Sequence, residues 1–154
     1  MTRVGDVDHS PPPPGPADGP AGFDAGFTVV EPLRAAMDLS FERVDADGID
    51  ASWTVGPGTH QPYGIVHGGV HAMVVEGLCS MAAALWLDSQ EREESKVVGV
   101  NNSTDFYRAV SEGRLTSTCR PIHRGRSQQV WTVETHDADG RLLARGQVRL
   151  QNLR

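Results

Sequence analysis

The chain has 154 residues, 38% of them hydrophobic, and a formal net charge of −6 at pH 7. This length predicts one domain, and the acidic balance argues against a nucleic-acid partner, because nucleic-acid-binding domains are usually basic. No apolar run reaches the length of a membrane span, and the N-terminus has no apolar stretch that could act as a secretory signal. Cys79 and Cys119 lack metal-type spacing and fit buried free thiols, so we expect a soluble cytoplasmic protein with no membrane partner.

The N-terminal part of the chain divides into a tail and a hairpin. Residues 1–22 are rich in proline and glycine and have little to bury, which predicts a disordered tail before one domain over residues 23–154. A short helical or irregular segment is expected near residues 24–36. Alternating apolar residues then predict strands over 37–44 and 49–55, joined by the turn sequence Asp45-Ala-Asp-Gly48.

The rest of the chain holds one long helical pattern, over residues 70–87. This pattern is apolar nearly all round, so we expect the helix to be buried on most sides. Three or four strands follow, over residues 96–106, 114–123, 127–136 and 141–150. A hairpin, a helix and an antiparallel meander predict an α+β fold in which a sheet wraps around one long buried helix.

The most informative stretch is residues 61–80, which contains Gly68 and Gly69 immediately before the helix. Neither glycine carries a Cβ, so a ligand can approach the backbone closely. The first N–H groups of the helix and its positive dipole end lie beside them. This arrangement suits a carbonyl oxygen that gains negative charge during a reaction.

Glu76 is the one carboxylate on this otherwise apolar helix, and it is a candidate nucleophile or general base. Gly69, Met73, Glu76 and Ser80 are spaced to share one helix face. This face could simply meet solvent, but the apolar neighbours of Glu76 favour a functional role. Ser80 can donate to the carboxylate, to an attacking water, or to its own backbone.

The sequence Gln61…His67-Gly68-Gly69…Glu76…Ser80, with the element order, resembles the PaaI-like acyl-CoA thioesterases, which have the hotdog fold. A Gln six residues before the His and a Glu nine residues after it match the Arthrobacter-type 4-hydroxybenzoyl-CoA thioesterase branch. Related enterobactin-proofreading and dihydroxynaphthoyl-CoA enzymes share this pattern, whereas another branch has Asn and Asp at these positions. The resemblance implies an orienting role for His67.

Helix geometry adds an expectation about assembly. Nine residues separate His67 from Glu76, about 13 Å of helix axis at 1.5 Å per residue. One thioester carbonyl cannot contact both positions within one subunit. The site therefore needs two antiparallel copies of the helix, which makes a homodimer with two shared sites the minimum active unit. The resemblance implies the same composite site and often a homotetramer.

Several basic residues are candidates for binding the CoA phosphates, which need cationic partners. The resemblance places Arg108 and the segment His123-Arg124-Gly-Arg126-Ser127 along the path of the nucleotide, and Gly69 beside the substrate. We favour Arg124 and Arg126 over Arg108. No cofactor is needed, because a thiolate is a good leaving group. A metal shared by His67 and His71 is not expected, because Gly68 stands where the zincin motif requires Glu.

These observations predict an acyl-CoA thioesterase that favours aryl or otherwise bulky acyl groups. The N–H of Gly68 would polarise the thioester carbonyl, and Gln61 would position the carbonyl and Glu76. Glu76 would either attack directly or deprotonate water. The alternative is a non-hydrolytic acyl-CoA-binding or ligand-sensing protein. It is disfavoured because such proteins usually carry a DNA-binding segment, and because a pure binder has no use for the Gln/Glu pair.

Overall fold

The computed structural model describes residues 36–90 and 96–153 of the chain. The proline-rich tail expected over residues 1–22 lies outside the described residues. Nearly all of the entry segment expected near residues 24–36 also lies outside them.

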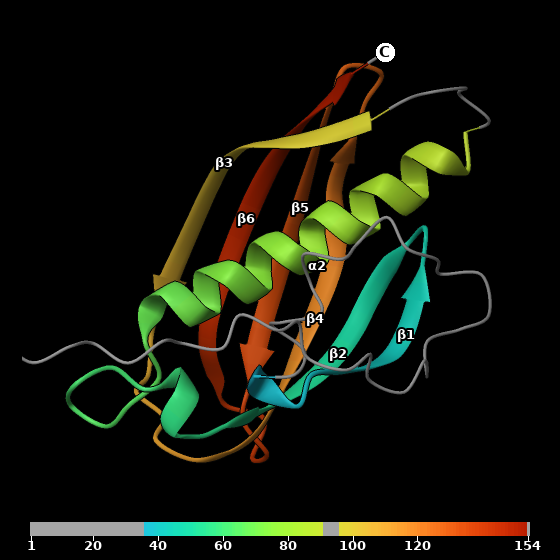
Figure 1. Ribbon diagram of the computed structural model, residues 1–154. Helices are drawn as coiled ribbons and strands as arrows, with labels where there is room; N and C mark the ends of the chain where they lie inside the picture. The colour runs from blue at the N-terminus through green and yellow to red at the C-terminus, as the bar shows by residue number, and fades with distance from the viewer. Residues whose placement is uncertain (1–35, 91–95, 154) are drawn as a thin grey trace, which may run out of the picture.

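One sheet of six antiparallel strands dominates the described residues, in the order β1-β2-β4-β5-β6-β3 (Figure 1). The strands are β1 Ser40–Asp45, β2 Gly48–Val55, β3 Lys96–Phe106, β4 Gly113–Arg124, β5 Gln128–His136 and β6 Leu142–Leu153. Each strand predicted from the alternating pattern is confirmed, with ends that agree within three residues. The order puts β1 and β3 at the two edges of the sheet.

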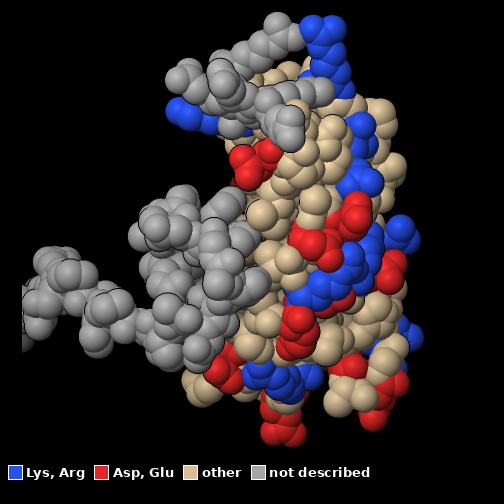
Figure 2. All heavy atoms as spheres, turned by 90° about the vertical axis from the view of Figure 1, so that its right-hand side faces the viewer, with Lys and Arg blue, Asp and Glu red and all other residues tan. Residues whose placement is uncertain are grey.

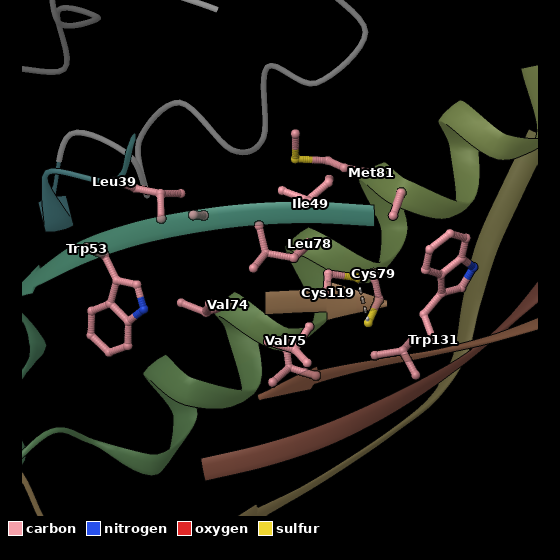
Figure 3. Close-up of a cluster of buried hydrophobic side chains, with 14 of the residues drawn as sticks. Leu39, Ile49, Trp53, Val74, Val75, Leu78, Cys79, Met81, Cys119 and Trp131 are labelled. Atoms are coloured by element: carbon pink, nitrogen blue, oxygen red, sulfur yellow. Dashed lines mark hydrogen bonds between the residues drawn. The ribbon is translucent and has the colours of Figure 1, made fainter. Parts of the chain in front are cut away.

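The long helix α2, Gly68–Asp88, lies across one face of this sheet, as expected (Figure 1). Its buried side chains Val74, Val75 and Leu78 pack against side chains of the sheet such as Trp53 and Trp131 (Figure 3). By length and composition alone α2 could cross a membrane, so the expectation that no apolar run is long enough was wrong. Its apolar character is explained by the core that it forms with the sheet.

The helix is buried or half-buried over most of its surface, as expected, and one stripe stays open. The stripe that contains Gly69, Met73 and Glu76 is exposed in the single chain. Ser80 continues this stripe and is half-buried. The spacing correctly placed these four residues on one face, and this face is left open beside the edge strand β3, where Glu76 lies close to Gly99.

The two edges of the sheet differ in chemistry. Near the β1 edge, ion pairs join Arg43 to Asp45 at 2.7 Å and Arg124 to Asp47 at 2.8 Å, and Figure 2 shows acidic and basic side chains interleaved on this side. The β3 edge instead exposes Val98, Val100 and Phe106 by 42%, 48% and 54%. Charged edges resist pairing with another chain, whereas an apolar edge strand is a template for it.

Cys79 of α2 and Cys119 of β4 are buried free thiols, as predicted (Figure 3). Their sulfur atoms lie 4.0 Å apart. Burial raises the pKa of the Cys79 thiol well above its ordinary value, which keeps it protonated. Both side chains therefore act as core residues.

Candidate active site

The start of α2 is held in place by the segments on either side of it. The backbone N–H of His67 donates to the carbonyl of Thr59, and that of Val66 donates to the carbonyl of Val110, each at 2.9 Å. These bonds tie the residues before the helix to the 3-10 helix η1, Pro57–Thr59, and to the segment after β3. The position of the first helical N–H groups is therefore set by the tertiary structure.

His67 caps the helix. Its Nδ1 accepts the backbone N–H of Gly69 at 2.8 Å, which is the bond of an N-cap residue. The N–H of Gly69 is thereby used within the chain. Among the described residues, no partner is assigned to the N–H of Gly68, which lies in the first turn where such donors are normally left over.

An aromatic ring lies against Gly68, so a side chain at this position would have to displace the ring. A Cβ built at position 68 would lie 2.9 Å from the Cε2 atom of Phe106, closer than real Cβ contacts allow. The ring comes from the last residue of β3, so the edge strand and the helix start meet here. A free N–H, a bare backbone and an apolar wall together fit a carbonyl group.

A pocket of about 270 Å³ lies beside this helix start. It is lined by Gln61, Ile65, Val66, Gly68, His71, Phe106, Tyr107, Arg108, Ala109 and Val110. Gln61 Oε1 accepts the N–H of Tyr63 at 3.1 Å, which fixes the side chain in a turn. Arg108 donates to the carbonyl of Leu142 at 2.9 Å. The structure therefore brings together three predicted site residues: Gln61, Gly68 and Arg108.

Glu76 and Ser80 do not reach this pocket within one chain. Glu76 lies eight residues after Gly68, about 12 Å along the helix axis. Its carboxylate lies instead beside the first half of the edge strand, with Oε1 3.4 Å from where a Cβ on Gly99 would stand. The single chain thus presents two half-sites, a pocket with a free N–H and an exposed carboxylate.

Apart from Arg108, which lines the pocket, the predicted phosphate-binding residues lie at the turn between β4 and β5, at the opposite end of the sheet from the pocket. The strand register shows this. Gln128, beside the turn, pairs with Gln151 near the end of β6, whereas Phe106 at the pocket pairs with Ala144 near the start of β6. Arg124 is paired with Asp47 at 2.8 Å and lies over the rings of Trp86 and Trp131. His123, Arg126 and Ser127 are exposed at the same turn.

His71 is a pocket residue that the sequence analysis considered only as a metal ligand. It is 4% exposed, and burial lowers its pKa to about 4. Its position three residues after Gly68 would have placed it on the same side of the helix. Nothing in the sequence indicated that this side faces a pocket.

Comparison with known proteins agrees with this architecture. Residues 63–144 match the family model described as the Thioesterase superfamily. The protein Rv1847 of Mycobacterium tuberculosis is 46% identical over 129 residues, which cover 84% of this chain and 91% of the relative. The 1,4-dihydroxy-2-naphthoyl-CoA hydrolase of Escherichia coli is 36% identical over 69% of this chain and 75% of its own.

A solved structure agrees as well. The crystal structure of AziG from S. sahachiroi matches with a TM-score of 0.72 and 54% identity, over 79% of this chain and 95% of that chain. The finer assignment to the 4-hydroxybenzoyl-CoA thioesterase branch stays a prediction. The chain belongs to the thioesterase superfamily, has its hotdog fold and is a thioester hydrolase.

Proposed function

We propose that the protein hydrolyses acyl-CoA thioesters at sites shared between two antiparallel copies of the chain. One observation carries this proposal: the pocket with the free N–H of Gly68 and the exposed carboxylate of Glu76 lie about 12 Å apart on one helix. The pocket lacks a carboxylate that could attack or accept a proton, and the Glu76 carboxylate lacks a pocket for the thioester. A second copy that runs in the opposite direction would complete both.

The edge strand β3 offers the surface for this second copy. Antiparallel pairing of β3 with its counterpart would satisfy the open backbone groups of the edge and cover Val98 and Val100. It would also cover Met73, which is 45% exposed on the open helix stripe. A dimer, or a dimer of such dimers, follows from this pairing.

The helix α2 and the edge strand β3 indicate the same position for the two-fold axis of the proposed dimer. Gly68 meets the partner's Glu76 if the axis lies near Ala72, midway between them in sequence. Asn102 Nδ2 donates to the carbonyl of Ala72 at 2.9 Å, so Ala72 is level with the middle of β3. A symmetric pairing of β3 about its own centre therefore places each carboxylate opposite the pocket of the other chain.

The chemistry needs a carbonyl to be polarised and then attacked. The N–H of Gly68 would stabilise the developing oxyanion, helped by the positive end of α2. In one route Glu76 attacks the carbonyl carbon, the C–S bond breaks, and water hydrolyses the mixed anhydride. In the other, Glu76 takes a proton from water, and the hydroxide attacks as the thiolate leaves. Both routes release the free acid and CoA without a metal or redox cofactor.

The remaining predicted residues have supporting roles in this proposal. Gln61 orients the thioester carbonyl and the partner's Glu76 from its turn beside the pocket. His67 holds the helix start through Gly69, which supports an orienting role over proton transfer. Ser80, one turn after Glu76, donates to the carboxylate or to the attacking water.

The CoA nucleotide would lie along the basic residues. In the antiparallel dimer, the β4–β5 turn with Arg126 in one chain approaches the pocket of the other, two strands from β3, or roughly 10 Å. Arg108 at the pocket rim and Arg124, His123 and Ser127 at the turn complete this path. The proposed acyl groups are aryl or otherwise bulky, which is supported by the name of the Escherichia coli relative, a 1,4-dihydroxy-2-naphthoyl-CoA hydrolase. The composition and thiol chemistry favour a cytoplasmic location.

A thiol-release assay tests this function. Purified protein is offered aryl-, short-chain and long-chain acyl-CoA esters, and free CoA is detected with a thiol reagent. Hydrolysis of aryl esters that is lost in Glu76→Gln supports the proposal. Binding of acyl-CoA without release of thiol would favour the alternative, a ligand-sensing protein.

A further inference from the structure

The pocket contains a buried polar side chain that the mechanism above does not use, the imidazole of His71. Its Nδ1 is buried and, within the described residues, has no hydrogen-bond partner. The side chain lines the pocket together with Gln61 and Gly68. Buried polar atoms are nearly always paired, so an unpaired one in a ligand pocket indicates that a ligand group completes it.

Two aromatic rings hold this imidazole in place without pairing it. Trp53 approaches it edge-on, with ring centroids 5.6 Å apart, and the centroid of Phe106 lies 6.0 Å away. The indole N–H of Trp53 donates to Ser117 Oγ at 3.0 Å, so it does not serve the imidazole. The rings therefore orient His71 and leave its hydrogen-bonding capacity unused.

His71 is neutral at the pH at which the enzyme would work. Because burial lowers its pKa to about 4, the ring keeps one N–H donor and one acceptor nitrogen at neutral pH. A neutral imidazole can pair with a hydroxyl or with a carbonyl oxygen, depending on its tautomer. It does not attract anions.

The position of His71 sets where such a group would lie on the substrate. His71 is three residues after Gly68, about 4.5 Å further along the same side of the helix. With the thioester carbonyl at the Gly68 N–H and the acyl group in the pocket, the imidazole would lie a few bonds from the carbonyl carbon.

We propose that His71 is a specificity-determining residue, which hydrogen-bonds an oxygen substituent that the acyl group carries within a few bonds of the thioester. This inference rests on the proposed hydrolysis and adds a substrate class to it, acyl groups with a nearby hydroxyl or carbonyl. A site built to pair a polar group rejects the analogue that lacks it, because the imidazole is then left unpaired.

Matched substrates and matched variants test this role. The kcat/KM of the wild-type protein is measured for benzoyl-CoA and for its 2-, 3- and 4-hydroxy derivatives. We expect one hydroxy isomer to exceed benzoyl-CoA by about tenfold, the size of one net hydrogen bond. His71→Phe keeps an aromatic ring between Trp53 and Phe106, and should lower the ratio of kcat/KM for the preferred hydroxy isomer over benzoyl-CoA from about tenfold to about one.

Two amide variants identify the nitrogen involved. The side-chain amide of His71→Asn can replace Nδ1, and that of His71→Gln can replace Nε2. One of them should restore part of the preference. The inference is overturned if the wild type shows no preference, or if His71→Phe lowers turnover of all four esters equally.

An NMR titration decides the role of His71 independently of turnover. Wild-type protein labelled with ¹⁵N-histidine is titrated with benzoate and with the hydroxybenzoates, and the His71 signals are assigned from His71→Gln. A hydroxybenzoate should shift a His71 nitrogen, and benzoate should not. No shift with any of these acids overturns the inference. If no CoA ester is hydrolysed, the hydrolysis proposal fails, and this titration still decides what His71 binds.

Discussion

At the scale of single residues, the environment of each group decides its part in the site. The carboxylate of Glu76 is exposed in the single chain and lies beside Gly99, where no side chain blocks it. The imidazole of His67 is used by the helix cap, and that of His71 is buried without a partner for Nδ1. Two histidines four residues apart thus have unrelated environments.

Glu76→Gln tests the carboxylate itself. The substitution keeps the size of the side chain and removes its ability to attack or to accept a proton. We expect kcat to fall by about 10²-fold or more, because a positioned base typically contributes that much, while the dimer still forms. Steady-state assays measure kcat, and light scattering measures the dimer. Turnover near the wild-type level would exclude Glu76 from the mechanism.

His71 predicts a pH dependence of stability. Its pKa is about 4 in the fold and about 6.5 in the unfolded chain, so the unfolded chain binds more protons between these values. The neutral imidazole therefore contributes roughly 3 kcal/mol to the free energy of unfolding above about pH 6.5, and this contribution is lost as the pH falls toward 4.

The measurement compares urea unfolding of the wild type and His71→Phe at pH 7.5 and 4.5, at one protein concentration. Between these pH values the wild type should lose about 2–3 kcal/mol more than the variant, which has no imidazole to charge. The carboxylates are the same in the two proteins, so their effect on the free energy of unfolding cancels in the comparison. Equal losses in both would show that His71 titrates normally in the fold.

At the scale of elements, the β3 edge is the part of the fold that is incomplete alone. Its exposed apolar side chains and open backbone contrast with the ion-paired β1 edge. The β4–β5 turn is the second element that functions across the dimer in our proposal. Each of these elements makes its own prediction.

Val100→Asp tests the β3 edge. A charge in the middle of this strand would be buried without a partner if two β3 strands pair, so we expect the dimer to dissociate and activity to fall with it. Ile122→Asp is the matched control, because Ile122 is also exposed, by 54%, but lies on β4. Light scattering follows both variants, and the thiol assay follows Val100→Asp. A dimer that survives in Val100→Asp would place the interface elsewhere.

Arg126→Ala tests the β4–β5 turn. A contact with the CoA phosphates is equal in the ground and transition states, so KM should rise with little change in kcat. One charge-assisted contact corresponds to about 1.5–3 kcal/mol if well ordered, and less if exposed. The effect should shrink for an N-acetylcysteamine thioester, which lacks the phosphates. Equal KM changes for both substrates would mean that Arg126 acts on structure and not on CoA.

At the scale of the whole molecule, the proposed site depends on two chains. The pocket and the carboxylate of one chain lie at different places on α2, and the two-fold axis inferred near Ala72 and the centre of β3 brings opposite halves together. Neither half is expected to hydrolyse a thioester alone. This dependence can be measured without knowing the natural substrate.

Complementation between two inactive chains is the test. A Gln61→Ala/Gly68→Ala chain and a Glu76→Ala chain are mixed under conditions where subunits exchange. Each heterodimer then contains one site with every native residue, so a 1:1 random mixture should regain about a quarter of the wild-type activity. If mass spectrometry shows heterodimers and no activity returns, the shared-site assignment is wrong.

The sequence by itself determined the elements and the spacing of the motif. The strands and the helix follow from local periodicity, because backbone geometry makes side chains alternate in a strand and recur every 3.6 residues in a helix. The shared face of Gly69, Met73, Glu76 and Ser80 follows from the same rule. Helix geometry also predicts that His67 and Glu76 of one chain would belong to different sites.

Only the tertiary structure decided which faces and edges stay open. Three features depend on contacts between residues far apart in the chain: the position of β3 beside β6 at the sheet edge, the exposure of the Glu76 stripe next to β3, and the ion pair of Arg124 with Asp47. His71 lies between Trp53 and Phe106 for the same reason. Such contacts arise from the packing of many side chains at once, which no local pattern in the sequence records.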